Sequence, residues 1–315
     1  MKRVLSIDGG GMLGRIPAAI LSSLYGKNQT ASWDLLAGTS TGGIIAIGLG
    51  LGLSPARIVQ FYDECGQEIF HRVAPNWNPF RSRYEADGRL IALTQHFGLR
   101  SFAQCSPRTM IPAYNMRRQR PKVFKSWSTQ DDLLTAVDVA MATSAAPIYF
   151  PPEEPGYCDG GLCLNHPAMV AYTEAKRLWG NHEQLFILSL GCGHSPDKGI
   201  AVNRRDDHGW GALRWLRNGL VPDIMMHAPL EAVDYQMKVL TEIYGDVYVR
   251  IDPEIPASLN VMDRATPEQM SALGDISAKW LKENASIASR LRTMLRSANA
   301  PWFGPSSLAE ESGNA

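Results

Sequence analysis

The sequence lacks any long run of uncharged apolar residues, and no stretch reaches the roughly 20 residues that a membrane-spanning helix needs. The basic start Met1–Arg3 is followed by a short apolar run, Val4–Ile7, which is too short for the core of a signal peptide. Cysteine is also scarce, and an odd number of scattered cysteines favours free thiols in a reducing compartment over a disulfide framework. Five are present: Cys65, Cys105, Cys158, Cys163 and Cys192. These absences predict a cytoplasmic protein without a membrane anchor.

The sequence also lacks an excess of basic or of acidic residues. The 31 basic and 31 acidic residues cancel, so the composition gives no reason to expect DNA or RNA binding. Metal-binding patterns are equally weak, because the spacing of Cys158 and Cys163 is not accompanied by a second Cys or His pair. We therefore expect neither a metal nor a cofactor.

One segment does have an uneven charge, since acidic residues are missing between Asp87 and Asp131. The cations inside it are Arg89, Arg100, Arg108, Arg117, Arg118, Arg120, Lys122 and Lys125. A loop from Trp77 to Phe80, with Arg81 and Arg83, precedes it. Both features are compatible with anionic lipid head groups, although a solvated turn and core packing explain each of them more simply.

Short apolar runs ending in glycine turns dominate the first half of the chain. Val4–Ile7 and Trp33–Ala37 read as buried strands, each leading through glycines into a helix, and Phe186–Leu190 reads as a third strand. Repeated strand, turn and helix units predict an α/β fold with a mostly parallel sheet. We expect one domain over residues 1–299, with a motif-bearing core at 1–195, a mostly helical part at 196–299 and a loose tail at 300–315. Within the helical part, Ile276–Leu295 is predicted to form an amphipathic helix.

Gly38-Thr39-Ser40-Thr41-Gly42 is a G-x-S-x-G pattern between an expected strand and an expected helix. Small residues such as Gly38 and Gly42 let a tight strand-to-helix turn pack while the serine hydroxyl stands clear. The start of the helix supplies N–H groups where negative charge develops. The pattern makes Ser40 a candidate nucleophile, although the same residues also occur in plain loops.

The turn Asp8–Gly14 carries three consecutive glycines after a strand, an arrangement that can aim backbone amides at one point as an oxyanion hole does. It also fits G-x-G-x-x-G, and Asp34 lies twenty residues after Gly14 as a dinucleotide site requires. However, Asp34 precedes the second strand instead of following it, which weakens that interpretation. A phosphate loop of an actin-like ATPase is a third alternative, but no second phosphate loop accompanies it.

The turn Asp159-Gly160-Gly161 by itself indicates nothing more than a turn. Together with the other motifs, it makes the chain from Val4 to Gly193 resemble the patatin-like phospholipases. The resemblance is carried by five stretches in order: Asp8–Gly14, Gly38–Gly43, Ser144–Pro152, Asp159–Ala168 and Ser189–Gly193.

The resemblance implies a three-layer α/β/α fold and a lipid acyl hydrolase with a Ser–Asp dyad that needs no histidine. By position, the dyad is Ser40 and Asp159, and the oxyanion amides are those of Gly9, Gly10 and Gly11. It also implies a phospholipid membrane surface as the substrate, and hence a protein peripheral to the inner membrane. A bacterial branch of the family is activated by cyclic oligonucleotides in anti-phage defence, and this chain is similar to it in outline. A homo-oligomer is compatible with these expectations.

One position departs from the family pattern. The family usually carries a basic residue just before the last glycine of the oxyanion loop, whereas this chain has Leu13 there and Arg15 after Gly14. Support of the oxyanion or of a phosphate by a basic side chain would therefore have to come from Arg15.

Two other functions are compatible with the sequence. One is a Ser-His-Asp esterase, because His194 and His227 follow Asp159 in the required order. The other is a catalytically silent scaffold or nucleotide-binding protein on the same fold, against which the presence of Ser40 and Asp159 speaks.

Overall fold

The computed structural model describes residues 1–26, 33–71, 80–196 and 220–296. These residues form a sheet of seven strands in the order β4-β3-β2-β1-β6-β7, with β5 paired to β3 outside that path. The strands are β1 (Lys2–Ile7), β2 (Leu35–Gly38), β3 (Arg108–Asn115), β4 (Arg120–Lys125), β5 (Tyr157–Asp159), β6 (Leu185–Leu190) and β7 (Val247–Ile251).

The sheet is mostly parallel, as expected. β1 runs parallel to both β2 and β6, β2 is parallel to β3, and β6 is parallel to β7. β3 pairs antiparallel with β4 and with β5. Buried residues alternate between the two faces: Leu5 and Ile7 belong to one core cluster, whereas Val4 belongs to the other. Both faces of the sheet are thus covered, which explains why the central strands are apolar at nearly every position.

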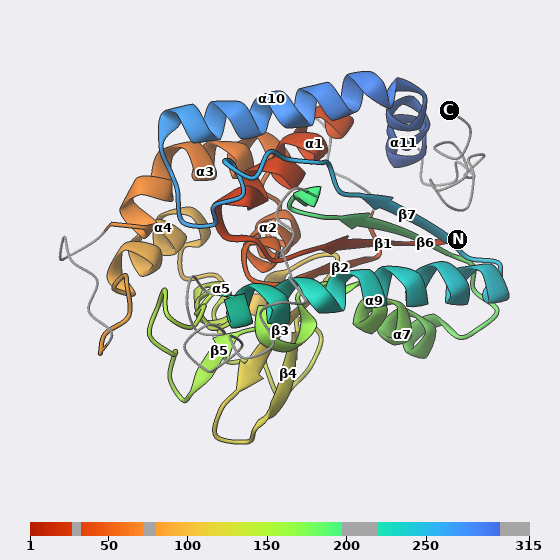
Figure 1. The fold of residues 1–315 in the computed structure, drawn as a ribbon. Coiled ribbons are helices and arrows are strands. Elements are labelled where there is room, and N and C mark those ends of the chain that lie inside the picture. Colours follow the sequence, from red (N-terminus) through yellow and green to blue (C-terminus); the bar gives the residue numbers. More distant parts are fainter. Residues whose placement is uncertain (27–32, 72–79, 197–219, 297–315) are drawn as a thin grey trace, which may run out of the picture.

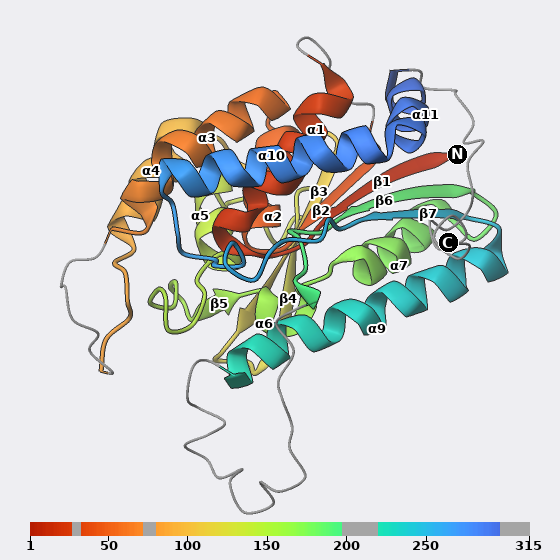
Figure 2. The ribbon, with the colours of Figure 1, turned by 45° about the horizontal axis from the view of Figure 1, so that its top comes forward.

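Helices cover both faces of the sheet and give the expected three layers. In Figures 1 and 2, α1, α3, α10 and α11 lie over one face, and α7 and α9 lie over the other. The helices are α1 (Arg15–Tyr25), α2 (Thr41–Gly50), α3 (Pro55–Ile69), α4 (Asp87–Phe97), α5 (Ala136–Thr143), α6 (Gly161–Leu164), α7 (Ala168–Trp179), α9 (Leu220–Tyr244), α10 (Pro267–Glu283) and α11 (Ala285–Arg296). In the part of the chain that the structure describes, no helix is both long and apolar enough to cross a bilayer.

The structure corrects one expectation for the C-terminal part. The amphipathic segment Ile276–Leu295 forms two helices, α10 and α11, because the helical backbone ends at Asn284. The Asn284 side-chain amide donates to the carbonyl oxygen of Trp280, which caps the end of α10. The expected tail at 300–315, the first part of the expected helical region (197–219) and Trp77 lie outside the described residues.

Candidate active site

Ser40 lies on the sharp turn between β2 and α2, where the sequence predicted it. Its φ of 54° falls in the left-handed region that is strained for a residue with a side chain. The flanking glycines are steric requirements of this turn. A Cβ at Gly38 would lie 2.0 Å from the Gly42 carbonyl oxygen, and a Cβ at Gly42 would lie 2.3 Å from that of Ile7. The close contacts are with backbone atoms, which cannot move aside as a flexible side chain could.

Asp159 ends the short strand β5 and faces this turn. The Ser40 hydroxyl donates a hydrogen bond of 2.6 Å to Asp159 Oδ2, and the Gly161 N–H donates one of 2.7 Å to Oδ1. Gly160 must be small, because a Cβ there would lie 2.4 Å from the carbonyl oxygen of Pro112 in β3. The two turns that the sequence singled out, 119 positions apart, therefore meet at one pair of side chains.

The Asp159 carboxyl is 2% exposed. Burial raises its pKa to about 6, against the opposing effects of the hydrogen bonds from Ser40 and Gly161 and of the Arg89 charge. A carboxylate with this pKa is ionised at neutral pH and is a stronger base than an exposed aspartate. The site can accordingly accept a proton from a serine hydroxyl.

The glycine-rich loop after β1 lies directly beside Ser40. A Cβ at Gly9 would come within 3.3 Å of the Ser40 Cβ and 2.2 Å of Asn165 Oδ1, so that any side chain would fill this space. Gly11 adopts a φ of 59°, which favours glycine. Within the described residues, no acceptor pairs with the backbone N–H of Gly10 or Gly11. These two amides are available to stabilise an oxyanion.

Gly9 does not fit its predicted role as a third oxyanion donor. Its N–H donates to the carbonyl oxygen of Asn165 at 3.1 Å, and this bond ties the loop to the segment after α6. The N–H of Met12, further along the loop, donates likewise to the Met262 carbonyl oxygen at 2.8 Å. The loop is thus fixed at both ends, with the amides of Gly10 and Gly11 between the two anchors.

Arg15, the basic residue from which support of an oxyanion would have to come, is paired with an acidic residue of a neighbouring helix. Its Nε donates to Asp63 Oδ1 at 2.8 Å, an ion pair between α1 and α3. The same guanidinium lies against Gly274 of α10. The side chain therefore joins three helices on one face of the sheet, and it is committed to Asp63 instead of to the oxyanion loop.

A buried ion pair that the sequence analysis missed holds the first residue of this loop. Arg250 on β7 contacts Asp8 at 2.7 Å and Asp252 at 3.2 Å. The pKa of Asp8 is raised to about 7 because burial outweighs the attraction of Arg250. His166 Nδ1 lies 3.3 Å from Asp8 Oδ1, but burial lowers the pKa of this histidine, so the contact is not an ion pair at neutral pH. Arg250 therefore supplies the positive charge that balances Asp8 at the start of the glycine-rich loop.

Arg89 on α4 is the second buried cation that the analysis missed as a site residue. Its side chain is 1% exposed, donates to the Ser144 carbonyl oxygen and pairs with Glu153 at 2.7 Å. The Ala145 carbonyl, one residue after Ser144, accepts the N–H of Asp159 at 3.0 Å. Arg89 thus connects both ends of the segment that leads into β5. A lone arginine on a helix gives no such signal in a sequence.

Three of the five histidines with described side chains have partners away from the dyad. His194 Nδ1 lies 3.6 Å from Asp252 Oδ2, and this carboxylate raises the pKa of His194. His166 Nε2 lies 3.2 Å from the hydroxyl of Tyr248, and His96 Nδ1 lies 2.9 Å from the Ala92 carbonyl. The side chain of His227 lies outside the described residues. The acceptor of the Ser40 hydroxyl is a carboxylate.

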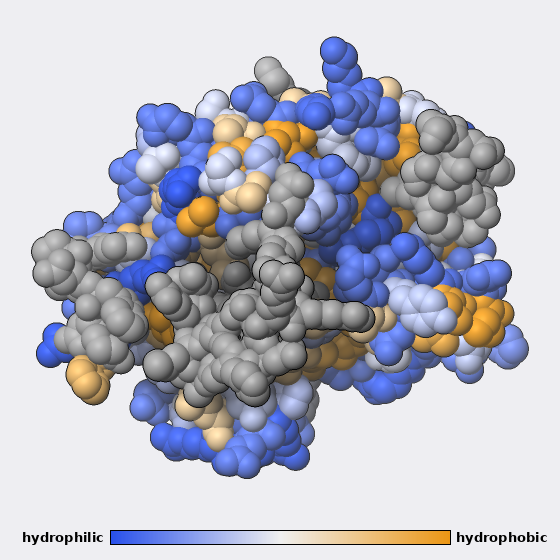
Figure 3. All heavy atoms as spheres, viewed as in Figure 1, coloured by the Kyte–Doolittle hydropathy of each residue, from blue (hydrophilic) through white to orange (hydrophobic). Residues whose placement is uncertain are grey.

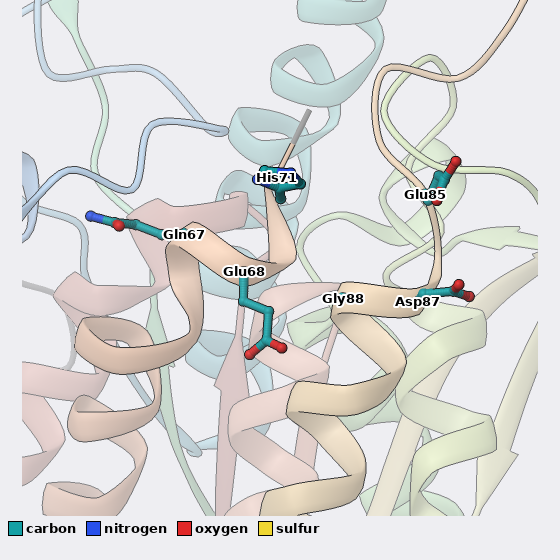
Figure 4. A pocket seen from close by; sticks show the side chains of 6 residues that line it. All are labelled: Gln67, Glu68, His71, Glu85, Asp87 and Gly88. Carbon is teal, nitrogen blue, oxygen red and sulfur yellow. The ribbon is translucent and has the colours of Figure 1, made fainter. Parts of the chain in front are cut away.

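A separate hollow lies between the end of α3 and the start of α4 (Figure 4). It has a volume of about 450 Å³, and its lining residues are Gln67, Glu68, His71, Glu85, Asp87 and Gly88. None of them belongs to the dyad or to the glycine loop. Despite the three carboxylates, no group of His, Cys, Asp and Glu with metal-binding geometry exists among the described residues.

Several known proteins are similar to this chain. The family model described as patatin-like phospholipase matches residues 5–172, more than half of the chain. Patatin-like protein 1 of Oryza sativa subsp. indica is 30% identical, covering 90% of this chain and 82% of its own. A cGAMP-activated phospholipase of Pseudomonas aeruginosa is 28% identical, and the match covers 96% of this chain and 90% of that relative. Among solved structures, VipD from Legionella pneumophila aligns with a TM-score of 0.43 and 10% identity, over 90% of this chain and 67% of that one.

Proposed function

Because the chain belongs to the patatin-like phospholipase family, we propose that it hydrolyses membrane phospholipids with Ser40 as nucleophile and Asp159 as its base. It is a serine esterase that acts on lipid acyl groups. The observation that carries the proposed dyad is the 2.6 Å hydrogen bond from the Ser40 hydroxyl to Asp159, beside the unpaired amides of Gly10 and Gly11. A Ser-His-Asp triad receives no support from the described histidines.

The reaction proceeds in two steps through an acyl-enzyme. Ser40 Oγ forms a bond to the ester carbonyl carbon while its proton passes to Asp159 Oδ2, and the Gly10 and Gly11 amides stabilise the oxyanion. The ester C–O bond then breaks, and Asp159 returns the proton to the leaving alkoxide, which departs as lysophospholipid. Water, deprotonated by Asp159, attacks the acyl carbon, and Ser40 leaves with that proton as the fatty acid is released.

The pH dependence of the reaction should report the base. We expect kcat/KM for a water-soluble ester to fall about tenfold per pH unit below about pH 6, because Asp159 must be ionised to accept the serine proton. Since burial raises this pKa, the loss begins about two units above the range of an exposed aspartate, near 4. The pH–rate profile of the intact protein measures it. Full activity down to about pH 4 would contradict the assignment of Asp159 as a buried base.

The relative named as a cGAMP-activated phospholipase supports a further part of the proposal. We propose that a cyclic oligonucleotide activates this chain too, in anti-phage defence. Mixed phospholipid vesicles should yield equal amounts of lysophospholipid and fatty acid by mass spectrometry, at a rate that rises with one member of a panel of cyclic di- and trinucleotides. Equal rates with and without the whole panel would refute the activation. A lack of product under all conditions would favour a catalytically silent protein.

A further inference from the structure

The hairpin of β3 and β4 extends past the active site. β3 is parallel to β2, with Ala37 opposite Met110, so the rest of β3 continues beyond the strand end that carries Ser40. Ala113 of β3 lies opposite Asp159 of β5. The hairpin tip, residues 116–120, is therefore further out on the same edge of the sheet. In Figure 1 the hairpin projects from the body of the molecule.

Within the acid-free basic segment, the arginines whose side chains have no acidic or aromatic partner in the described part of the chain lie at this tip. Four of its eight cations are engaged with the protein: Arg89 with Glu153, Arg100 with backbone carbonyls, Lys122 with Asp131 and Lys125 with Glu174. Arg108 lies 6.0 Å from the ring of Trp127, and Arg117 lies 3.4 Å from Glu154 on the surface. Arg118 and Arg120 are exposed, and neither guanidinium has an acidic or aromatic partner in the described part of the chain.

An apolar side chain at the tip contacts the strand that carries Asp159. Met116 is 48% exposed, its N–H donates to the Gly156 carbonyl oxygen at 2.9 Å, and its sulfur lies 3.0 Å from the thiol of Cys158. Cys158 immediately precedes Asp159. The tip thus combines unpaired cations with a half-exposed methionine that contacts the strand carrying the base. Figure 3 shows mainly hydrophilic residues on this projecting part.

We propose that the hairpin tip docks on an anionic phospholipid bilayer, with Arg118 and Arg120 against lipid phosphates and Met116 at the head-group boundary. Cations near an anionic surface each contribute binding that salt screens, and a long apolar side chain fits the interface. Because the tip extends beyond Ser40, docking there brings the serine toward the ester linkages. This inference rests on the proposed function and adds the surface through which the substrate is reached.

The test compares three double variants in a Ser40→Ala background, so that the vesicles are not consumed. Arg118→Gln/Arg120→Gln should bind vesicles of phosphatidylcholine and phosphatidylglycerol about 30-fold more weakly in sedimentation, since each arginine near the surface contributes about 1 kcal/mol. Arg118→Lys/Arg120→Lys should retain most of the binding, because its charge is unchanged. Lys282→Gln/Arg290→Gln removes two exposed cations from α10 and α11 and should bind as the parent does.

With Ser40 restored, the Arg118→Gln/Arg120→Gln variant should lose activity on vesicles relative to a nitrophenyl ester in solution. Unchanged vesicle binding, or an equal loss in the Lys282→Gln/Arg290→Gln variant, would overturn the docking surface. Arginine-dependent vesicle binding by a protein that hydrolyses neither substrate would support the docking and refute the proposed function. The two proposals can therefore fail separately.

Discussion

Replacement of Ser40 by alanine is expected to lower kcat for ester hydrolysis by about 10⁵- to 10⁶-fold, because no acyl-enzyme can form without the hydroxyl. Asp159→Asn should cost about 10⁴-fold, since the amide leaves the geometry nearly intact but cannot accept the serine proton. Initial rates on a nitrophenyl ester and on phospholipid measure both effects. The two losses should not add in the double variant, because the two residues act as one unit.

Controls for this prediction must separate chemistry from folding. Ser258→Ala removes an exposed serine hydroxyl remote from the dyad in sequence and should retain full activity. Each variant should melt within a few degrees of the parent, as followed by circular dichroism. His194→Ala should retain most of the activity, because His194 is paired with Asp252. Substantial turnover by Ser40→Ala would contradict the nucleophile, and a loss on His194→Ala comparable to that on Asp159→Asn would favour a triad.

The turns of the candidate site that the structure contains where the sequence predicted them are those encoded by local backbone geometry. Gly38 and Gly42 flank a turn that only small residues permit, and the same holds for Gly160 beside Asp159. A steric requirement of this kind can be recognised in the sequence, because the small residues lie within a few positions of the residue that they flank. The parallel sheet was predictable for a related reason, since strands buried on both faces are apolar throughout.

The parts that were missed depend on contacts between distant segments. The N–H of Gly9 is engaged by a backbone carbonyl at Asn165, and backbone groups carry no sequence signal. Arg250 pairs with Asp8 across 242 positions, although a charged residue within the apolar strand β7 was a hint that it needed a buried partner. The strand β5 has three residues, too few to show a periodicity. Asn284 divides α10 from α11 within a segment whose amphipathic pattern continues across the break.

The buried Arg250 leads to the second prediction with a large effect. Arg250→Met is expected to destabilise the fold by about 3–5 kcal/mol, because the buried Asp8 would lose its counter-charge and Asp252 would keep only His194. Urea denaturation measures the free energy of unfolding. Asp8→Asn/Arg250→Met should be less destabilised than Arg250→Met alone, because it also removes the buried Asp8 carboxylate that would lack a counter-charge. A loss below about 1 kcal/mol would mean that the ion pair contributes little.

The pH dependence of this loss has a definite sign. In the parent, Arg250 opposes the rise in the pKa of Asp8, so its removal raises this folded-state pKa further above about 7. A carboxyl whose pKa is higher in the folded than in the unfolded state destabilises the fold above the folded pKa, and protonation relieves the penalty as pH falls. Arg250→Met should therefore lose less stability at about pH 5 than at about pH 8. A loss that is equal at both values would show that packing of the arginine, and not its charge, holds Asp8 and the glycine-rich loop in place.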